Sequence, residues 1–198
     1  MAIRVSPMKR KQIQKTMIES ERVVASLKRH AGRILTIGEE LIACLRSGRT
    51  ILTAGNGGSA AEALHMAEEL TGRYRSDRRP LSALCLAADA TALTCIGNDF
   101  GFAQVFVRQL EALGRPGDVV VFFSTSGKSE NLVKALSLAR KRGLKTVCLL
   151  GRGGGRMAGR GDHEIIVASQ STGRIQEAHQ VVMHLLLEII EEGFGLKG

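Results

Sequence analysis

The sequence predicts an α/β protein built on a single doubly wound, five-stranded parallel sheet with helices on both faces. Two observations support this fold class. From residue 50 onward, short runs rich in Val, Ile and Leu alternate with segments of helical length. The runs are apolar throughout, as expected for parallel strands that are buried on both faces. In such a sheet, ligands bind at the carboxyl ends of the strands, so the loops there are the candidate sites.

Two amphipathic helices are predicted ahead of the first strand, at residues 8–29 and 32–46. Apolar residues recur in both segments every three or four positions, which is the helical period. We expect residues 1–49 to form a helical extension that packs on the core or on an oligomer partner. Residues 50–198 are expected to form the sheet domain, and since no linker separates the two parts, we expect one structural unit.

The remaining elements follow from the alternation of apolar runs and helical segments. Strands are predicted at residues 50–54, 81–87, 119–123, 145–151 and 163–168. Helices are predicted to begin near residue 59, to span 90–96 and 102–113, to end near residue 142, and to run from about 173 to 192. The glycine-rich segment 151–161 is predicted to be a flexible turn between the last two strands.

The composition is ordinary for a globular protein, with 44% hydrophobic and 24% charged residues in a chain of 198. No apolar run approaches the ~20 residues that span a bilayer. The first residues also lack the apolar segment of a signal peptide. We therefore expect a cytoplasmic protein with no membrane contact. The four cysteines form no CxxC pair, which favours reduced thiols over a disulfide or a cysteine-ligated metal.

The net charge of +9 raises the possibility of nucleic-acid binding, so the location of the charge matters. Residues 1–50 hold 11 Lys and Arg against 4 Asp and Glu, whereas the rest of the chain holds 17 against 15. The excess therefore lies in the N-terminal helices. With one Tyr and no Trp, the chain lacks the aromatic residues of a single-strand stacking surface. A solvated basic face is the favoured interpretation, and nucleic acid is an unlikely partner.

The first candidate site is the glycine loop at residues 55–59, which joins a strand to a helix. Such a loop can hold a phosphate at the helix start. Gly55, Gly57 and Ala60 also satisfy the permissive dinucleotide-binding pattern, so a nucleotide-dependent oxidoreductase has to be considered. That pattern requires an acidic residue at the end of the second strand. The only candidate is Asp89, which lies 29 residues after Ala60 and beyond the apolar run, so the signal is weak.

The helix after this loop carries His65 and Glu69 four residues apart, so both side chains project from one face. A metal ion or an acid–base pair is the chemistry that such a pair serves. In the final helix, Gln176, Gln180 and His184 share a second polar face. His179 points elsewhere and is predicted to be a packing or surface residue.

A hydroxyl-rich loop follows the third predicted strand and is the better phosphate site. Its hydroxyls belong to Ser124, Thr125, Ser126 and Ser129. Backbone amides, hydroxyls and the helix dipole all favour an anion there. The loop is not a Walker loop, because Phe122 stands where that motif requires glycine. The alternative interpretation is a plain N-cap with Ser129 as the capping residue, but a cap needs one hydroxyl and not four.

A third loop, at residues 97–101, contains Asn98 and Asp99 between two glycines. Asn and Asp are common in glycine turns for conformational reasons alone. Taken by itself, this stretch is equally consistent with a turn and with a site.

Together these segments resemble the sugar isomerase (SIS) domain, and within it the phosphoheptose isomerases. The resemblance covers roughly residues 50–192 and rests on four motifs in family order, GNGGSAAEALHMAEELTGRYR, GNDFGF, STSGKS and RIQEAHQVVMH. It implies a flavodoxin-like fold and an aldose–ketose isomerase acting on sedoheptulose 7-phosphate in bacterial surface-sugar synthesis. It also implies a homotetramer with zinc-containing sites between subunits. Lys128 departs from the family pattern, in which asparagine is expected.

The resemblance also implies roles for individual residues. The zinc ligands would be His65, Glu69, Gln176 and His184. The substrate's sugar would lie against Asn56, Gly57, Gly58, Glu69, Asn98, Asp99 and Gln176. Its phosphate would be bound by Ser124, Thr125, Ser126 and Ser129.

Isomerisation through an enediol needs a base at carbon and an acid–base partner for the oxygens. Glu69 is the candidate base and His184 the candidate partner. Gln176 lies about 12 Å from His184 along a helix that rises ~1.5 Å per residue, so it is the least secure of the four metal ligands. The rival hypotheses are a non-catalytic SIS protein that binds the replication initiator and a phosphosugar-binding regulator. Neither requires His65, Glu69 and His184 together.

Overall fold

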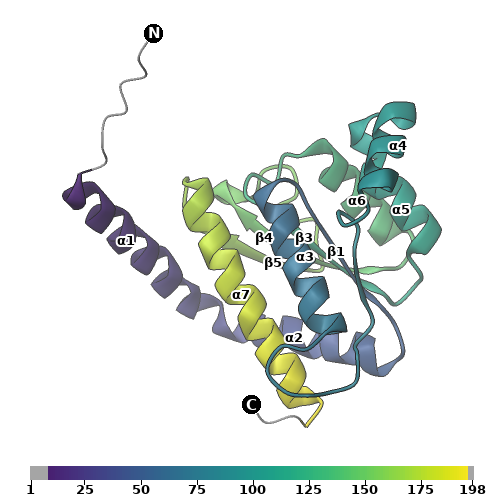
Figure 1. The fold of residues 1–198 in the computed structure, drawn as a ribbon, viewed down its shortest axis with the longest axis horizontal. Coiled ribbons are helices and arrows are strands. Elements are labelled where there is room, and N and C mark those ends of the chain that lie inside the picture. Colours follow the sequence, from purple (N-terminus) through teal and green to yellow (C-terminus); the bar gives the residue numbers. More distant parts are fainter. Residues whose placement is uncertain (1–8, 196–198) are drawn as a thin grey trace.

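In the computed structural model, which describes residues 9–195, five strands form one parallel sheet in the order β2-β1-β3-β4-β5 (Figure 1). The strands are β1 (Ile51–Gly55), β2 (Ala83–Cys85), β3 (Val119–Ser124), β4 (Lys145–Gly151) and β5 (His163–Val167). The predicted doubly wound α/β fold is therefore confirmed, with each strand close to its expected place. β2 is the exception in length. It keeps three residues of the seven-residue run, because it is an edge strand that pairs with β1 alone.

Helices cover both faces of the sheet. They are α1 (Arg10–Ala25), α2 (Ala31–Arg46), α3 (Gly58–Thr71), α4 (Ala90–Phe100), α5 (Val105–Leu113), α6 (Glu130–Lys141) and α7 (Thr172–Gly193). Three short 3₁₀ segments are also present, η1 (Ser26–His30), η2 (Phe102–Gln104) and η3 (Arg152–Gly154).

Successive residues of each strand point to opposite faces, which divides the core in two. Ile51 of β1 packs with α2, α3 and α7 on one face, and its neighbour Leu52 packs with α5 and α6 on the other. β1 and β3 are buried along their whole length. This explains why their sequences are apolar without alternation.

The N-terminal helices form one continuous helical run, because η1 joins α1 to α2 without a break. This differs from the prediction of two separate helices, and its cause is that residues 30–32 continue in helical conformation. The run packs along α7 (Figure 1). Ile34, Ile37 and Leu41 of α2 are buried in the same core as the sheet. Residue 8, at which the first helix was predicted to begin, lies outside the described residues.

The prediction of a turn at residues 97–101 is wrong. Residues 97–100 form the last turn of α4, and only Gly101 leaves the helix. The helix starts where Asp89 accepts hydrogen bonds from the backbone N–H groups of Thr91 and Ala92, an ordinary N-cap. The prediction stopped at Ile96 because Gly97, Asn98 and Asp99 are residue types that favour turns.

Two candidate loops meet at the centre of the sheet. The chain runs from β1 outward to β2 in one direction and from β3 outward to β4 and β5 in the other. β1 and β3 are neighbours, and Gly55 at the end of β1 pairs with Phe123 of β3. The glycine loop and the hydroxyl-rich loop therefore lie side by side at the topological switch point, which is where ligands bind in sheets of this type.

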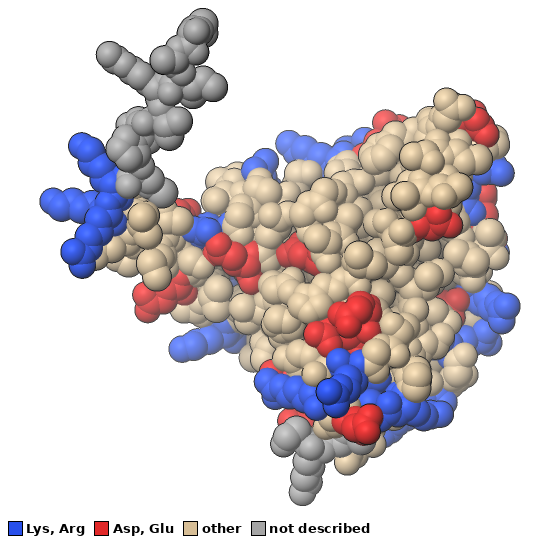
Figure 2. Space-filling view, viewed as in Figure 1, with Lys and Arg blue, Asp and Glu red and all other residues tan. Residues whose placement is uncertain are grey.

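Figure 2 shows Lys and Arg side chains gathered at the far end of α1, in line with the basic excess of the first 50 residues. Among the described residues, no helix combines the length and apolar character that crossing a membrane demands.

Candidate functional site

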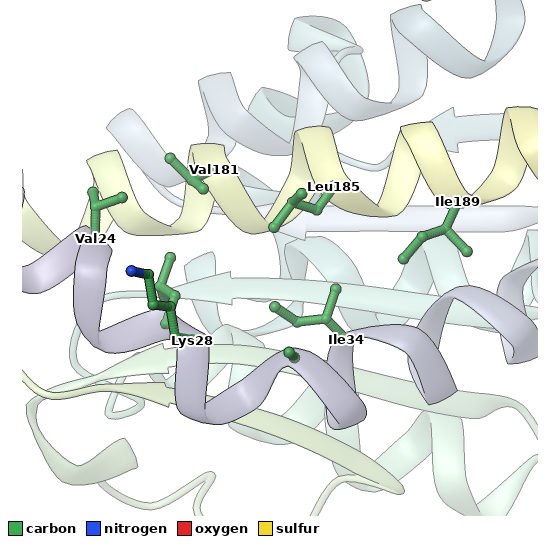
Figure 3. Close-up of a pocket in the computed structure, with 8 residues that line it drawn as sticks. Val24, Lys28, Ile34, Val181, Leu185 and Ile189 are labelled. Atoms are coloured by element: carbon green, nitrogen blue, oxygen red, sulfur yellow. The ribbon is translucent and has the colours of Figure 1, made fainter. Parts of the chain in front are cut away.

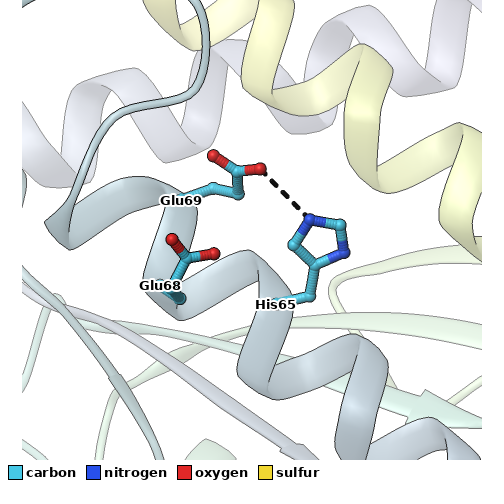
Figure 4. Close-up of side chains that lie close together, drawn as sticks. All are labelled: His65, Glu68 and Glu69. Atoms are coloured by element: carbon cyan, nitrogen blue, oxygen red, sulfur yellow. Dashed lines mark hydrogen bonds and ion pairs between the residues drawn. The ribbon is translucent and has the colours of Figure 1, made fainter.

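The centre of the candidate site is His65 on α3. Its Nε2 lies 3.1 Å from Oε1 of Glu69, one helical turn further on, as Figure 4 shows. Its Nδ1 lies 2.5 Å from Nε2 of Gln180 on α7. The ring is therefore held from both sides by two helices. The sequence placed Gln180 on the polar face of α7, but nothing in the sequence predicted its contact with His65.

Glu68 joins this cluster. The ligand atoms of His65, Glu68 and Glu69 all lie within 4.8 Å of one another. Glu68 is exposed, while Glu69 is half-buried. The residues at i, i+3 and i+4 of a helix share a face, so the spacing His-x-x-Glu-Glu was the signal that could have included Glu68.

His184 of α7 lies beside the cluster. Its ring centroid is 5.4 Å from that of His65, with the two planes nearly perpendicular. The His184 ring also stacks on Tyr74, with centroids 5.7 Å apart and planes 20° apart. Burial lowers the pKa of His184, and a positive charge on His65 lowers it further, against the opposing effect of Glu69 and Glu188. The neutral imidazole is therefore favoured, and it can accept a proton.

Gln176 lies near the start of α7, about two helical turns before His184. It packs against Gly58 so closely that a Cβ on this glycine would come within 2.3 Å of the Gln176 amide nitrogen. The absence of a side chain at Gly58 thus leaves room for the Gln176 amide in its present position. His65 and Glu69 are in direct contact and His184 adjoins them, whereas Gln176 contacts the loop. Its place among the metal ligands stays a prediction.

The glycine loop is tied to the neighbouring helix by an amide pair. Asn56 and Asn131 exchange two side-chain hydrogen bonds, of 3.0 and 2.9 Å. Asn131 belongs to the first turn of α6, which follows the hydroxyl-rich loop. The pair therefore fixes the two candidate loops relative to each other, and it uses both polar atoms of the Asn56 side chain.

Within the hydroxyl-rich loop, two hydroxyls shape the loop and two have no protein partner. Ser124 Oγ accepts a hydrogen bond from the Gly127 N–H, and Ser126 Oγ accepts one from the Lys128 N–H. Ser129 occupies the N-cap position of α6, but its side chain makes no capping hydrogen bond. The interpretation of this loop as a plain serine cap therefore fails. Among the described residues, Thr125 and Ser129 offer free hydroxyls.

The glycine-rich segment 151–161 supports this loop rather than forming a loose turn. Gly127 has φ +59° and lies so close to the Gly154 carbonyl that a Cβ would be 1.8 Å from its oxygen. The Gly127 carbonyl accepts a hydrogen bond from the N–H of Met157, which is fully buried. Close contact between two backbones is the reason for the glycines, and composition alone does not distinguish such contact from flexibility.

Asn98 and Asp99 are exposed on α4, and their side chains hydrogen-bond to each other. Asp99 also accepts a weak hydrogen bond from the Cys95 thiol. α4 buries no residue and stands apart from α3 and α7 (Figure 1). Within one chain, these two residues are therefore not brought to the His65 cluster. Asp89, which the dinucleotide pattern requires, is used as the cap of α4.

Behind the cluster, Glu62 of α3 and His179 of α7 are buried and face each other. Glu62 Oε2 lies 3.9 Å from His179 Nδ1, and neither group has a hydrogen-bond partner at these atoms. His179 was predicted to be either a packing residue or a surface residue, and it is a packing residue. Its Nε2 lies 3.2 Å from the Leu150 carbonyl oxygen. Burial raises the pKa of Glu62 to about 7 and lowers that of His179 to about 4. Both side chains are thus held neutral near pH 6.

The donor set of the cluster fits a zinc ion. Imidazole nitrogens and a carboxylate are zinc ligands, and His65 and Glu69 already direct such atoms at each other. The amide of Gln180 faces the far nitrogen of His65. Turned so that its oxygen accepts the Nδ1–H, this amide is the kind of partner that orients a metal-bound imidazole. His184 adjoins the cluster and supplies a second imidazole.

Comparison with known proteins is consistent with this geometry. A family model described as the SIS domain matches residues 18–151. Phosphoheptose isomerase 1 of Campylobacter jejuni is 45% identical over 182 residues, which are 92% of this chain and 98% of the relative. The phosphoheptose isomerase of Geobacter sulfurreducens is 48% identical over 171 residues, covering 86% and 90% of the two chains. The solved phosphoheptose isomerase of Neisseria gonorrhoeae superposes with a TM-score of 0.87 at 38% identity, covering 92% and 98%.

Proposed function

The chain belongs to the SIS-domain family and, within it, to the phosphoheptose isomerases, which are aldose–ketose isomerases. From this membership and the site we propose that it converts sedoheptulose 7-phosphate to D-glycero-D-manno-heptose 7-phosphate. The observation that carries the proposal is the contact of Glu69 with His65, beside His184. That arrangement offers a carboxylate base and a neutral imidazole in one place.

The phosphate end of the substrate is assigned to the hydroxyl-rich loop. The free hydroxyls of Thr125 and Ser129 and the start of α6 favour a phosphate monoester. Ser124 and Ser126 hold the loop in shape through their bonds to backbone N–H groups, and they complete the proposed set. The sugar end is assigned to Asn56, Gly57, Gly58, Asn98, Asp99 and Gln176.

The reaction moves one proton between adjacent carbons. Glu69 removes the proton from C1 of the ketose, the C1–H electron pair forms the C1–C2 double bond, and the C2 carbonyl oxygen becomes the anionic oxygen of an enediolate. His184 takes the proton of the O1 hydroxyl and passes it to O2. Glu69 then returns its proton to C2 as the C1–O1 carbonyl forms, which gives the aldose. The lowered pKa of His184 supports its role, since the imidazole starts neutral.

A zinc ion is part of the proposal. His65, Glu69, Gln176 and His184 would hold it, and the bound ion would polarise the substrate carbonyl. The chain's own residues then keep the carboxylate and the imidazole at the reacting carbons. Because Gln176 packs on the glycine loop, it also ties that loop to the metal-binding helix.

We further propose that the protein assembles as a homotetramer with its sites between subunits. An apolar groove between the N-terminal run and α7 supports this, as Figure 3 shows. It is lined mainly by Val24, Leu27, Ala31, Ile34, Val181, Leu185 and Ile189. Leu35 and Leu185 are 51% and 37% exposed. Sedimentation should report four chains for the wild type and fewer for Leu185→Glu, while a wild-type monomer at micromolar concentration would overturn the proposal.

A sugar phosphate carries charge and does not cross a bilayer unaided, so the cytoplasm is the proposed location. The proposed role is the supply of heptose for bacterial surface glycans. The alternatives, a non-catalytic partner of the replication initiator or a phosphosugar regulator, would have no use for the paired imidazoles and carboxylate.

The deciding experiment is direct. The purified protein is incubated with sedoheptulose 7-phosphate, with and without a chelator, and the products are followed by NMR. We expect an aldose 7-phosphate, with loss of turnover after chelation and its return when zinc is added. Absence of any aldose from zinc-loaded protein would overturn the proposed reaction, and full turnover in metal-free protein would overturn the role of zinc.

A further inference from the structure

The segment at residues 73–80 connects α3 to β2 and crosses the C-terminal ends of α3 and α7. We propose that this segment is a strap that sets the position of Glu69 relative to His184. Arg78 and Glu191 are its anchoring residues, and Tyr74 orients the His184 ring. The inference rests on the proposed function, because it assigns these residues to positioning the acid–base pair of the isomerase.

Arg78 binds the end of α3. Its Nη2 donates to the Glu69 carbonyl at 2.7 Å, and its Nη1 donates to the Leu70 carbonyl at 2.9 Å. Carbonyls in the last turn of a helix have no partner within the helix, so the guanidinium caps α3. The capped residue is the proposed base itself.

The same guanidinium is paired with the end of α7. Arg78 Nε lies 3.2 Å from Oε1 of Glu191, and the two side chains are only 3% and 5% exposed. Glu191 also accepts hydrogen bonds from the backbone N–H groups of Arg75 and Ser76, each at 3.3 Å. One carboxylate on α7 thus holds the strap at three residues.

The strap reaches α7 at two further points on the His184 side. Arg75 Nη2 lies 2.6 Å from Oε1 of Glu188. Tyr74 stacks on His184, and the ring of His65 is nearly perpendicular to that of His184. His184, Glu188 and Glu191 are at i, i+4 and i+7, so they share one face of α7. Figure 2 shows acidic and basic side chains in contact at the end of the molecule where α3 and α7 terminate.

A buried ion pair is a poor device for stability, because its desolvation cost offsets its Coulomb attraction. The Arg78–Glu191 pair has a geometric consequence instead. It fixes the backbone of Glu69 to a point two turns beyond His184, and it does so without contacting any loop proposed to bind substrate. Displacement of a reacting group by 1 Å can cost about 100-fold in rate.

The first test replaces the pair by apolar residues, in the double variant Arg78→Met/Glu191→Leu, so that neither charge is left buried alone. The matched control is Arg33→Met, since Arg33 also donates to the backbone carbonyl of a glutamate, Glu164, but at the β5 edge of the sheet. We expect kcat to fall about 100-fold in the double variant, with KM changed less than threefold. The control should keep wild-type constants. Equal kcat values in the double variant and the control would overturn the strap.

The second test does not depend on turnover and serves if the double variant fails to fold. In protein labelled at its histidine rings, the His184 resonance is assigned by its absence in His184→Ala. Tyr74→Leu should shift this resonance and lower kcat about tenfold, because the stacked ring is lost. Tyr74→Phe keeps the ring and should leave the resonance and kcat near wild-type values. An unshifted His184 resonance in Tyr74→Leu would overturn the orienting role.

The proposed function and the proposed strap would be contradicted by different results. If wild-type protein yields no aldose, the proposed function fails. There is then no kcat to compare between the variants, and the His184 resonance tests the strap instead. If wild type is active and the double variant is equally active, the strap fails and the proposed function stands.

Discussion

The two faces of the sheet are built by different rules. On the face covered by α5 and α6, the buried sides of the helices are apolar apart from Asn131, whose amide is fully engaged with Asn56. On the face covered by α3 and α7, the helices bury Glu62, His179 and Glu191 between them. Two of these groups, Glu62 and His179, have polar atoms without a partner.

The two faces have different roles: one holds the proposed phosphate-binding loop, and the other holds the proposed acid–base residues. The apolar face fixes the hydroxyl-rich loop at the start of α6, and it needs no ionisable group to do so. The α3–α7 seam holds carboxylates and imidazoles at some cost in stability, since buried polar groups without partners are unfavourable. Local rules of folding are broken mainly where function requires it. Substitutions on the two faces should therefore affect different quantities.

The largest effect is expected at the polar seam. Glu69→Gln and His184→Ala should each lower kcat by about 10²–10⁴-fold, because each removes a proton-transfer group. The thermal midpoint should move by only a few degrees, since both positions are partly open to solvent. Steady-state kinetics with calorimetry measures both. Near-normal kcat in either variant would refute the acid–base assignment.

The apolar face should respond in stability alone. Leu136→Ala, at a fully buried position of α6, should destabilise the protein by about 2–5 kcal/mol, the usual cost of a cavity left by a leucine. The kinetic constants per folded molecule should stay at wild-type values. Urea unfolding, with assays at urea concentrations well below the unfolding midpoint, would show this. A loss of kcat without a loss of stability would contradict the difference between the two faces.

The seam should also carry a pH dependence of stability. Burial raises the pKa of Glu62 from 4.5 to about 7, so between these values the folded protein holds a proton that the unfolded chain has released. The associated stability is present below pH 4.5 and is lost as the pH rises through 7.

Glu62→Gln cannot ionise and should escape this loss. Relative to wild type, the variant should gain on the order of 2–3 kcal/mol between pH 4.5 and pH 8. His179 opposes the trend in the acid range, because its lowered pKa makes the folded state bind fewer protons, but it does so in both proteins. Unfolding free energies at several pH values would decide. A difference between the two proteins that is constant with pH would mean that Glu62 is not held neutral by burial.

The smallest effect is expected in the hydroxyl-rich loop. Ser129→Ala should raise KM roughly tenfold with little change in kcat, because the free Ser129 hydroxyl is one of the proposed phosphate donors and a single hydrogen bond to a charged group contributes about 1.5 kcal/mol. Ser137→Ala, on the outer part of α6, is the matched control because its hydroxyl contacts Arg160 instead. If both variants showed the same KM, this loop would not be the phosphate site.

Much of this architecture was predictable, because the spacing of the apolar residues and the length of each segment identify it as a strand or a helix. The run VVVFF is short, rich in β-branched and aromatic residues and preceded by a Pro-Gly-Asp turn, which together favour a buried strand. His65 and Glu69 lie on one face of any helix that contains both. The resemblance to the SIS domain and its isomerase branch is likewise confirmed by the relatives. These features depend on local sequence alone.

The features that escaped prediction depend on contacts between distant segments. The pairing of Gln180 with His65 and of Arg78 with Glu191 spans more than 100 residues, and no local pattern encodes it. The glycines near residue 154 were predicted to form a flexible turn. A glycine-rich segment that packs closely against another backbone has the same composition as a flexible one, so the sequence does not distinguish them. The last turn of α4 was missed because Gly97, Asn98 and Asp99 are residue types that favour turns, although Leu93, Ile96 and Phe100 keep the helical spacing.

We propose that Glu69 moves the proton between the two carbons. Sedoheptulose 7-phosphate incubated in deuterium oxide with wild-type protein should gain deuterium at the carbon where Glu69 returns the proton, C2 of the aldose, as NMR would show. With Glu69→Gln at the same concentration, exchange and product should fall together by about 10²–10⁴-fold. Deuterium incorporation at the wild-type rate in Glu69→Gln would contradict the account.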